Sequence, residues 1–304
     1  MLKPPAGKVA AALAAVYIIW GSTYLGIRIG IETIPPFLMA GMRQTTAGLV
    51  LYAWLRWRGV PRPERVHWRS ATIVGALMLL VGNGGVAWAE KVVPSGLTAL
   101  LIATMPLWMT LLDWQWHGAA RPGAQVVAGL ALGFIGAGLL VAPGQFAGGT
   151  HIDPWGGLAL FAATVAWAAG SLYSRRAKLP ASALQGAAME MLTGGALLLV
   201  ASGLFGEWRG FEFARVSQRS WIALAYLTTL GSIVAYSAYM WLMKVTTPAR
   251  ASTSAYVNPI VAVLLGWWLG GEPMNARILL AACVIILAVV LLISHRPAPP
   301  AEIA

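Results

Sequence analysis

Charged residues are scarce in this chain. Only 10% of its 304 residues are Asp, Glu, Lys or Arg, whereas a soluble chain carries about 25%. Polar segments are also short, and the longest of them, residues 204–219, is too small to fold as a separate domain. These shortages exclude an ordinary soluble protein and indicate a chain that lies mostly in lipid.

Cysteine and catalytic motifs are missing as well. The one cysteine, Cys283, cannot form a disulfide within the chain, and a Cys/His metal site has too few ligands. The sequence contains no His-Glu-x-x-His, Gly-x-Ser-x-Gly or Gly-x-x-x-x-Gly-Lys-Ser/Thr motif. We therefore expect no metal, no other cofactor and no ATP-driven reaction. An integral-membrane enzyme remains as the weaker alternative.

Acidic residues are few relative to basic ones, and the net charge is +11. A nucleic-acid-binding protein would gather this charge on one patch, but here Lys and Arg form short clusters between apolar stretches, as at 56–69 and 175–178. Basic residues in short loops mark the cytoplasmic side of a membrane protein. The pattern predicts no nucleic-acid partner and places both chain termini in the cytoplasm.

Long apolar stretches are what the chain does contain. A bilayer core about 30 Å thick needs roughly 20 apolar residues in a helix. Stretches of this kind predict an all-α polytopic membrane protein with ten transmembrane helices. The expected spans are residues 9–28, 37–55, 70–90, 95–116, 124–142, 154–173, 182–203, 220–243, 249–270 and 276–294.

The two halves of the chain also resemble each other. Matching residues recur in the same order at nearly constant offsets: Trp20 with Trp167, Arg43 with Glu190, Gly48 with Gly195 and Pro106 with Pro259. This predicts two repeats of five helices, 1–147 and 148–304. Because five is odd, the second repeat enters the membrane in the opposite sense, which is a recurrent design of transporters with a central substrate cavity.

Such an architecture predicts transport of a small molecule by alternating access, with substrate and lipid bilayer as partners. A passive channel is the alternative, although channels usually build their pore around an oligomer axis. Gly129 and Gly133 form a Gly-x-x-x-Gly pair in span 124–142. The pair permits a weak homo-oligomer, but packing within the bundle explains it more simply.

Polar and aromatic side chains inside the spans are the predicted substrate-binding groups, because such groups in hydrocarbon must be paired or face water. They are Trp20, Ser22, Tyr24, Asn83, Trp88, Thr104, Trp167, Ser171, Tyr236, Tyr239, Ser254 and Asn258. Helix N-termini near Ser95 and Pro248 would favour a substrate carboxylate. By contrast, Glu90 and Lys91 are expected in solvent.

Two prolines and two charges complete the predicted site. Pro106 and Pro259 lie within spans, where proline kinks a helix and frees carbonyl groups, so they are candidate gating or kink positions. Arg43 and Glu190 lie near the middle of their spans at matching places in the two repeats. We expect them to form an intramembrane charge pair, since pairing would relieve the cost of burying both. Separate partners for each charge are the alternative.

Three segments resemble a known family: residues 18–24 (IIWGSTY), 93–97 (VPSGL) and 256–260 (YVNPI). They are similar to EamA-type members of the drug/metabolite transporter superfamily, and in particular to bacterial inner-membrane exporters of the YddG and YedA type. The resemblance implies the ten-helix fold with a central cavity, a location in the bacterial inner membrane, and export of amino acids, including aromatic ones. Export of drugs or other amphipathic metabolites is the alternative within this class.

One motif of the family is present in only one repeat. The Gly-Glu motif before the last span reads Gly270-Gly271-Glu272-Pro273, whereas the matching position of the first repeat, 117–120, lacks the acid. A role that needs both glutamates is therefore not expected here.

Overall fold

The computed structural model describes residues 5–117, 123–141, 153–246 and 254–294. These residues form helices joined by short turns, with no strand among them. The helices before residue 142 are α1 (Ala6–Ala15), η1 (Val16–Trp20), α2 (Gly21–Gly30), α3 (Pro36–Trp57), α4 (Arg65–Val74), η2 (Gly75–Asn83), α5 (Gly84–Ala89), α6 (Ser95–Ile102), α7 (Met105–His117) and α8 (Ala124–Val141). Those after residue 153 are α9 (Pro154–Arg176), α10 (Ala183–Leu204), η3 (Phe213–Arg215), α11 (Gln218–Tyr226), η4 (Leu227–Tyr236), α12 (Ser237–Val245), α14 (Ser254–Gly270) and α15 (Ala276–Ser294). The expected boundary at 147/148 lies outside the described residues.

Several helices are long and apolar enough to cross a membrane, as the composition predicts. Within the described part of the chain there are six: Ala6–Gly30, Arg65–Ala89, Ser95–Trp116, Pro154–Arg176, Ala183–Leu204 and Gln218–Val245. Shorter apolar helices cover Val257–Gly270 and Ala276–Ala288. The expected span 37–55 is helix α3, which is not among the six and which carries Arg43 and Gln44 inside its length.

Local sequence signals begin several of these helices. Proline stands at the first position of α3 and α9, where its missing N–H costs nothing. The side chain of Asp153 accepts a hydrogen bond from the backbone N–H of Gly156 at 2.9 Å, and Ser182 accepts one from Gln185 at 3.3 Å. These caps satisfy N–H groups that the helices leave unpaired.

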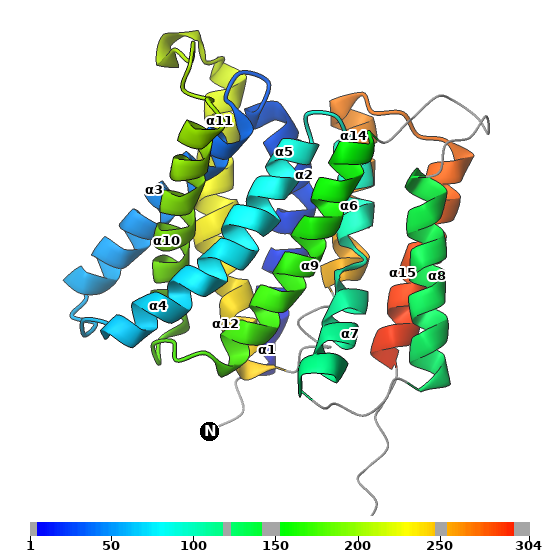
Figure 1. Cartoon of the computed structure of the whole chain (residues 1–304), viewed down its shortest axis with the longest axis horizontal. Helices are drawn as coiled ribbons and strands as arrows, with labels where there is room; N and C mark the ends of the chain where they lie inside the picture. Colours follow the sequence, from blue (N-terminus) through cyan, green and yellow to red (C-terminus); the bar gives the residue numbers. More distant parts are fainter. Residues whose placement is uncertain (1–4, 118–122, 142–152, 247–253, 295–304) are drawn as a thin grey trace, which may run out of the picture.

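The bundle has a dense part and a peripheral pair. Helices α3 and α10 pack against each other, while α8 and α15 lie side by side at the edge of the bundle (Figure 1). Gly133 of α8 packs against Leu107 of α7, and Gly136 of α8 packs against Ile285 of α15. These small residues therefore make contacts within the chain, which is the simpler of the two explanations for them.

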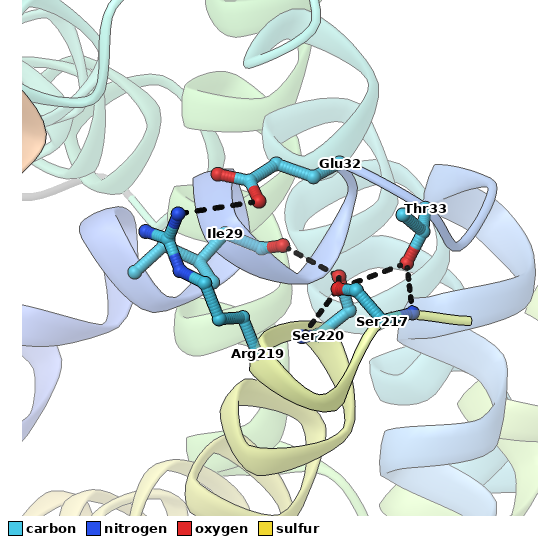
Figure 2. A network of polar contacts seen from close by, with 6 residues as sticks. All are labelled: Ile29, Glu32, Thr33, Ser217, Arg219 and Ser220. Atoms are coloured by element: carbon cyan, nitrogen blue, oxygen red, sulfur yellow. Dashed lines mark hydrogen bonds and ion pairs between the residues drawn. The ribbon is translucent and has the colours of Figure 1, made fainter.

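The path of the chain in Figure 1 begins with α1 and ends with α15 at the same end of the bundle. A chain that crosses the membrane an even number of times has the start of its first helix and the end of its last helix on the same side, as seen here. At one end of the bundle, a polar network joins the turn after α2 to the start of α11 (Figure 2). Ser217 donates its backbone N–H to Thr33 Oγ1 at 3.1 Å, and Ser220 donates its hydroxyl to the carbonyl of Ile29 at 2.9 Å. The network holds the first and eighth expected spans together at their ends.

Candidate functional site

A cavity lies between the two halves of the chain. It has about 90 Å³ of space that the centres of water-sized molecules can occupy, which is room for several water molecules. The described residues that line it are mostly apolar, aromatic or uncharged polar. They are Trp20, Thr23, Tyr24, Ile27, Arg43, Gln44, Leu79, Gly82, Asn83, Val86, Ala99, Ile102, Ala103, Met105, Ala163, Trp167, Gly231, Tyr236, Ser254, Asn258 and Pro259.

Three π-helical segments contribute to the wall of this cavity. Segment η1 ends at Trp20, η2 ends at Asn83 and η4 ends at Tyr236, and all three residues line the cavity. A π-helix bonds each N–H to the carbonyl five residues earlier, so it is wider than an α-helix, and such segments occur frequently at functional sites. The expected spans 9–28, 70–90 and 220–243 are therefore helices that widen where they meet the cavity.

An aromatic cluster joins the two halves at this wall. The rings of Trp20 and Trp167 meet edge to face with centroids 5.6 Å apart, and Tyr239 lies 5.0 Å from Trp20. Trp20 also donates its indole N–H to the carbonyl of Gly231 at 3.1 Å. Offset and edge-to-face arrangements of this kind stabilise aromatic pairs, so the cluster is a rigid apolar surface at the cavity.

Arg43 is the charged member of the described lining. Its side chain is 3% exposed, and Nε donates a hydrogen bond to Ser232 Oγ at 2.8 Å. Atom Nη1 has no hydrogen-bond partner among the described residues. Burial of a guanidinium group with an unused donor is costly, so this side chain is held where a ligand can complete its coordination.

Glu190 does not line the cavity but contacts a residue that does. It is fully buried, and Oε2 accepts a hydrogen bond from the hydroxyl of Tyr236 at 2.9 Å. The expected ion pair with Arg43 is absent from the ion pairs of the described residues. The reason is η4, which presents Ser232 to Arg43 and Tyr236 to Glu190 one helical turn apart. Each charge therefore has its own hydroxyl partner.

The structure brings many of the predicted substrate-binding residues together. Those that line the cavity are Trp20, Tyr24, Asn83, Trp167, Tyr236, Ser254 and Asn258. The others lie outside its lining, and most of them bond to neighbouring helix groups. Ser22 donates to the carbonyls of Ile18 and Ile19, Thr104 donates to that of Leu101, Ser171 bonds to Tyr239, and Trp88 lies in α5.

The two prolines differ in their settings. Pro259 lies inside α14 and lines the cavity. Pro106 is the second residue of α7 and lies outside the lining, just after the continuous helix breaks at Ala103 and Thr104. Ala103 itself lines the cavity. The helix is therefore interrupted near Pro106 but continuous around Pro259, and of these two prolines only Pro259 borders the cavity.

The helix N-terminus at Ser95 was expected to favour a substrate carboxylate, but it already holds one of the protein's own. Glu272 Oε1 accepts hydrogen bonds from the backbone N–H and the hydroxyl of Ser95 at 2.7 and 2.6 Å, and Oε2 accepts one from the N–H of Gly96 at 2.9 Å. The preceding Gly271 has φ of +63°, a left-handed conformation that glycine adopts freely. The Gly-Glu motif is therefore a helix cap here. The second expected terminus, at Pro248, lies outside the described residues.

Glu90 was expected in solvent but is fully buried at the turn after α5. Both of its carboxylate oxygens lack a hydrogen-bond partner among the described residues, while the guanidinium group of Arg28 donates to its backbone carbonyl. Burial and the nearby Glu272 carboxylate raise the pKa of Glu90, and Arg28 opposes them. The apolar stretch before Glu90 contains no signal that the following turn folds inward.

Gln44, Gly231 and Met105 line the cavity but were not predicted as site residues. Gln44 directly follows Arg43, and a polar residue next to a charge in the middle of a span could have been predicted to line the cavity. Gly231 has no side chain and contributes its carbonyl, which accepts the hydrogen bond from Trp20. Met105 is an ordinary apolar residue. Neither could be separated from the other membrane residues by type alone.

These observations define the class of protein: a polytopic helical membrane protein with a cavity lined by residues of both halves of the chain. Comparison with known sequences identifies the family, since the EamA-like transporter family matches residues 7–142 and again 154–294. The chain belongs to the EamA-like transporter family. It is a multi-pass inner-membrane transporter and not an enzyme.

Several relatives carry transporter or exporter names. The uncharacterized inner membrane transporter YedA of Escherichia coli strain K12 is 42% identical over 292 residues, which are 96% of this chain and 92% of that protein. A probable terminal-alkyne amino-acid exporter of Streptantibioticus cattleyicolor is 26% identical over 263 residues, 86% of each chain. A protein of known crystal structure shares the fold with a TM-score of 0.67 at 23% identity, covering 94% of this chain and 96% of that one.

Proposed function

We propose that the chain is a secondary transporter that exports small metabolites, amino acids among them, by alternating access. In this proposal two inverted five-helix repeats, 1–147 and 148–304, rock against each other around the cavity. The observation that carries the proposal is a cavity lined by aromatic and polar residues of both halves. The double match to the EamA-like family, one in each half, supports the division into repeats.

Amino acids are the proposed substrates because the cavity combines an aromatic surface with polar groups. Trp20, Trp167 and Tyr236 offer apolar contact to a side chain, while Asn83 and Asn258 offer hydrogen bonds to a polar end. One relative is named as an amino-acid exporter. Aromatic amino acids suit the aromatic part of the wall best.

Counterflow into proteoliposomes tests this proposal. Vesicles loaded with unlabelled L-phenylalanine should take up labelled L-phenylalanine faster than empty vesicles, and the rate should saturate. Gly82 lines the cavity, and a Cβ there would lie 2.9 Å from the ring of Trp167. Gly82→Leu should therefore abolish counterflow, while Gly7→Leu, at an exposed glycine with nothing within 4 Å of its Cβ position, should not. Uptake that rises linearly without saturation would instead indicate a channel.

A further inference from the structure

The cavity contains a positive charge that no carboxylate of the described residues neutralises. Arg43 lines the cavity, forms no ion pair among the described residues and leaves Nη1 without a hydrogen-bond partner. The acid that was expected to pair with it, Glu190, is bonded to Tyr236. The positive charge is therefore available to a ligand.

The guanidinium group lies at the wall of the cavity. Its Nε is fixed by Ser232 at 2.8 Å, and a Cβ built on Gly231 would lie 2.9 Å from Nη2. Gly231 is itself a lining residue. A glycine at this position leaves room for the end of the arginine side chain, so the group is held in one place while keeping donors free.

The chemistry of an unpaired guanidinium group selects its ligand. Arginine presents N–H donors in a planar fork that fits a carboxylate, and such charge-assisted bonds are among the strongest in proteins. In a membrane interior an uncompensated charge is costly, so a ligand that supplies the opposite charge gains more than it would in water. A carboxylate bound at Arg43 would meet both requirements.

Two side-chain amides provide the complementary half of the site. Gln44 Oε1 and Asn83 Oδ1 are buried acceptors without partners among the described residues, and both residues line the cavity. Amide oxygens accept hydrogen bonds from an ammonium group. The described lining thus contains a free donor with positive charge, two free acceptors and an aromatic surface.

We propose that Arg43 anchors the carboxylate of the substrate, and that the substrates are amphipathic α-amino acids whose ammonium group is bound by Gln44 and Asn83. This inference rests on the proposed function, because it names the substrate class of the same cavity. It also assigns different roles to the two matching charges. Arg43 contacts the substrate, whereas Glu190 accepts a hydrogen bond from Tyr236 and so positions that lining residue.

Three labelled indole compounds separate these contributions in efflux from loaded proteoliposomes, after subtraction of leakage from protein-free vesicles. L-Tryptophan has both charged groups, indole-3-propionate has the carboxylate alone, and tryptamine has the ammonium group alone. The wild-type protein should export L-tryptophan fastest and tryptamine slowest. Arg43→Gln should lower L-tryptophan export about tenfold or more and abolish the preference for the acids, as expected for loss of hydrogen bonds to a charged group.

Two further variants separate substrate binding from folding. Ser232→Ala removes the hydrogen-bond partner of Arg43 but keeps its charge, so the preference for acids should persist even if total export falls. Asn83→Leu should reduce export of L-tryptophan and leave that of indole-3-propionate unchanged.

The outcomes distinguish the anchor from the transport function. Two results would overturn the role of Arg43 while leaving the proposed export function intact. One is saturable wild-type export of tryptamine as fast as that of L-tryptophan, and the other is an unchanged preference for acids in Arg43→Gln. Export of none of the three compounds by the wild-type protein would overturn the proposed function and the anchor together.

Discussion

Gly48 of α3 and Gly195 of α10 occupy reciprocal places in the contact between their helices. A Cβ on Gly48 would lie 2.7 Å from the backbone nitrogen of Leu192, and a Cβ on Gly195 would lie 2.6 Å from that of Thr45. Neither distance leaves room for a side chain, so the two backbones approach as closely as glycine permits. This contact holds Arg43 and Glu190, which lie one to two turns away on the same helices.

Gly195→Ala should therefore destabilise the protein. The added methyl group meets backbone atoms that cannot move aside, and overpacking of this kind typically costs about 1–3 kcal/mol. Gly186→Ala on the same helix is the matched control, since nothing lies within 4 Å of its Cβ position and alanine favours a helix by up to about 1 kcal/mol. Apparent melting temperatures in detergent should fall for the first variant and hold or rise for the second; equal melting temperatures would contradict the close approach.

Tyr236→Phe should destabilise the protein through Glu190. The substitution removes the hydroxyl that donates to Oε2, and the carboxyl group then has no partner in a fully buried position. An unsatisfied buried group of this kind costs about 1–3 kcal/mol. Pairing the change with Glu190→Met removes the polar group as well, so the double variant should melt higher than Tyr236→Phe alone. A double variant that melts lower would show that Glu190 is stabilised by other groups.

Glu272→Gln should weaken the attachment of the turn before α15 to the start of α6. The carboxylate accepts three hydrogen bonds from Ser95 and Gly96, and an amide would turn an N–H₂ group toward one of these donors. Loss of a cap costs about 0.5–2 kcal/mol. Glu212→Gln is the control, because that acid is half exposed in a surface ion pair with Arg215 and such pairs contribute little. Thermal unfolding of both variants measures the difference.

A pH titration tests the second acid cap. Glu207 lies outside the membrane-spanning helices and accepts hydrogen bonds from the backbone N–H groups of Phe37 and Leu38 at 3.2 and 2.8 Å. Burial raises the pKa of Glu207 against the opposing effect of these bonds and of Lys91. Because the folded protein then binds this proton more tightly than the unfolded chain, the associated stability is present at low pH and is lost as pH rises through the folded pKa.

The comparison is between wild type and Glu207→Gln. From about pH 4 upward, the usual range of a glutamate, the advantage of wild type in melting temperature should shrink. The unfolded wild-type chain releases its proton at a lower pH than the folded protein does, which favours unfolding, whereas the glutamine variant has no proton to release at this position. An advantage that grows with pH would mean that the hydrogen bonds outweigh burial and that the sign of the shift is reversed.

Much of the architecture could be predicted because lipid imposes a simple rule on sequence. Long apolar stretches must be helices, and the helical segments observed fall close to the expected spans. Matching pairs such as Trp20 with Trp167 and Gly48 with Gly195 identified real contacts, since the first pair meets edge to face and the second shares one helix interface. These pairs pack against each other, so the same residue type is needed at the matching position of each half, and the match is visible in the sequence.

The finer chemistry of the cavity could not be predicted in the same way. The π-helical segments depend on which carbonyl each N–H selects, and no residue type in 16–20, 75–83 or 227–236 determines that choice. The partners of Arg43 and Glu190 depend on where η4 lies between their helices. Side chains such as Ser171 and Thr104 were polar for a local reason, namely bonds to a neighbouring hydroxyl or carbonyl, which a list of polar residues cannot distinguish from cavity lining.

Exchanging the two buried charges should fail to restore transport. If Arg43 and Glu190 stabilised each other directly, Arg43→Glu combined with Glu190→Arg would recover function that the single variants lose. In the structure each charge has a different hydroxyl partner on η4, and Arg43 alone lines the cavity. The double variant would therefore put an acid at the cavity wall and a large cation behind Tyr236.

We expect efflux of L-tryptophan from proteoliposomes to remain at the level of the single variants. The control is the same exchange at the surface, Glu212→Arg with Arg215→Glu, where an exposed pair at 2.8 Å tolerates reversal and export should match wild type. Recovery in the buried exchange would show that the two side chains meet in another state of the transport cycle. The separate hydroxyl partners seen here would then belong to only one conformation.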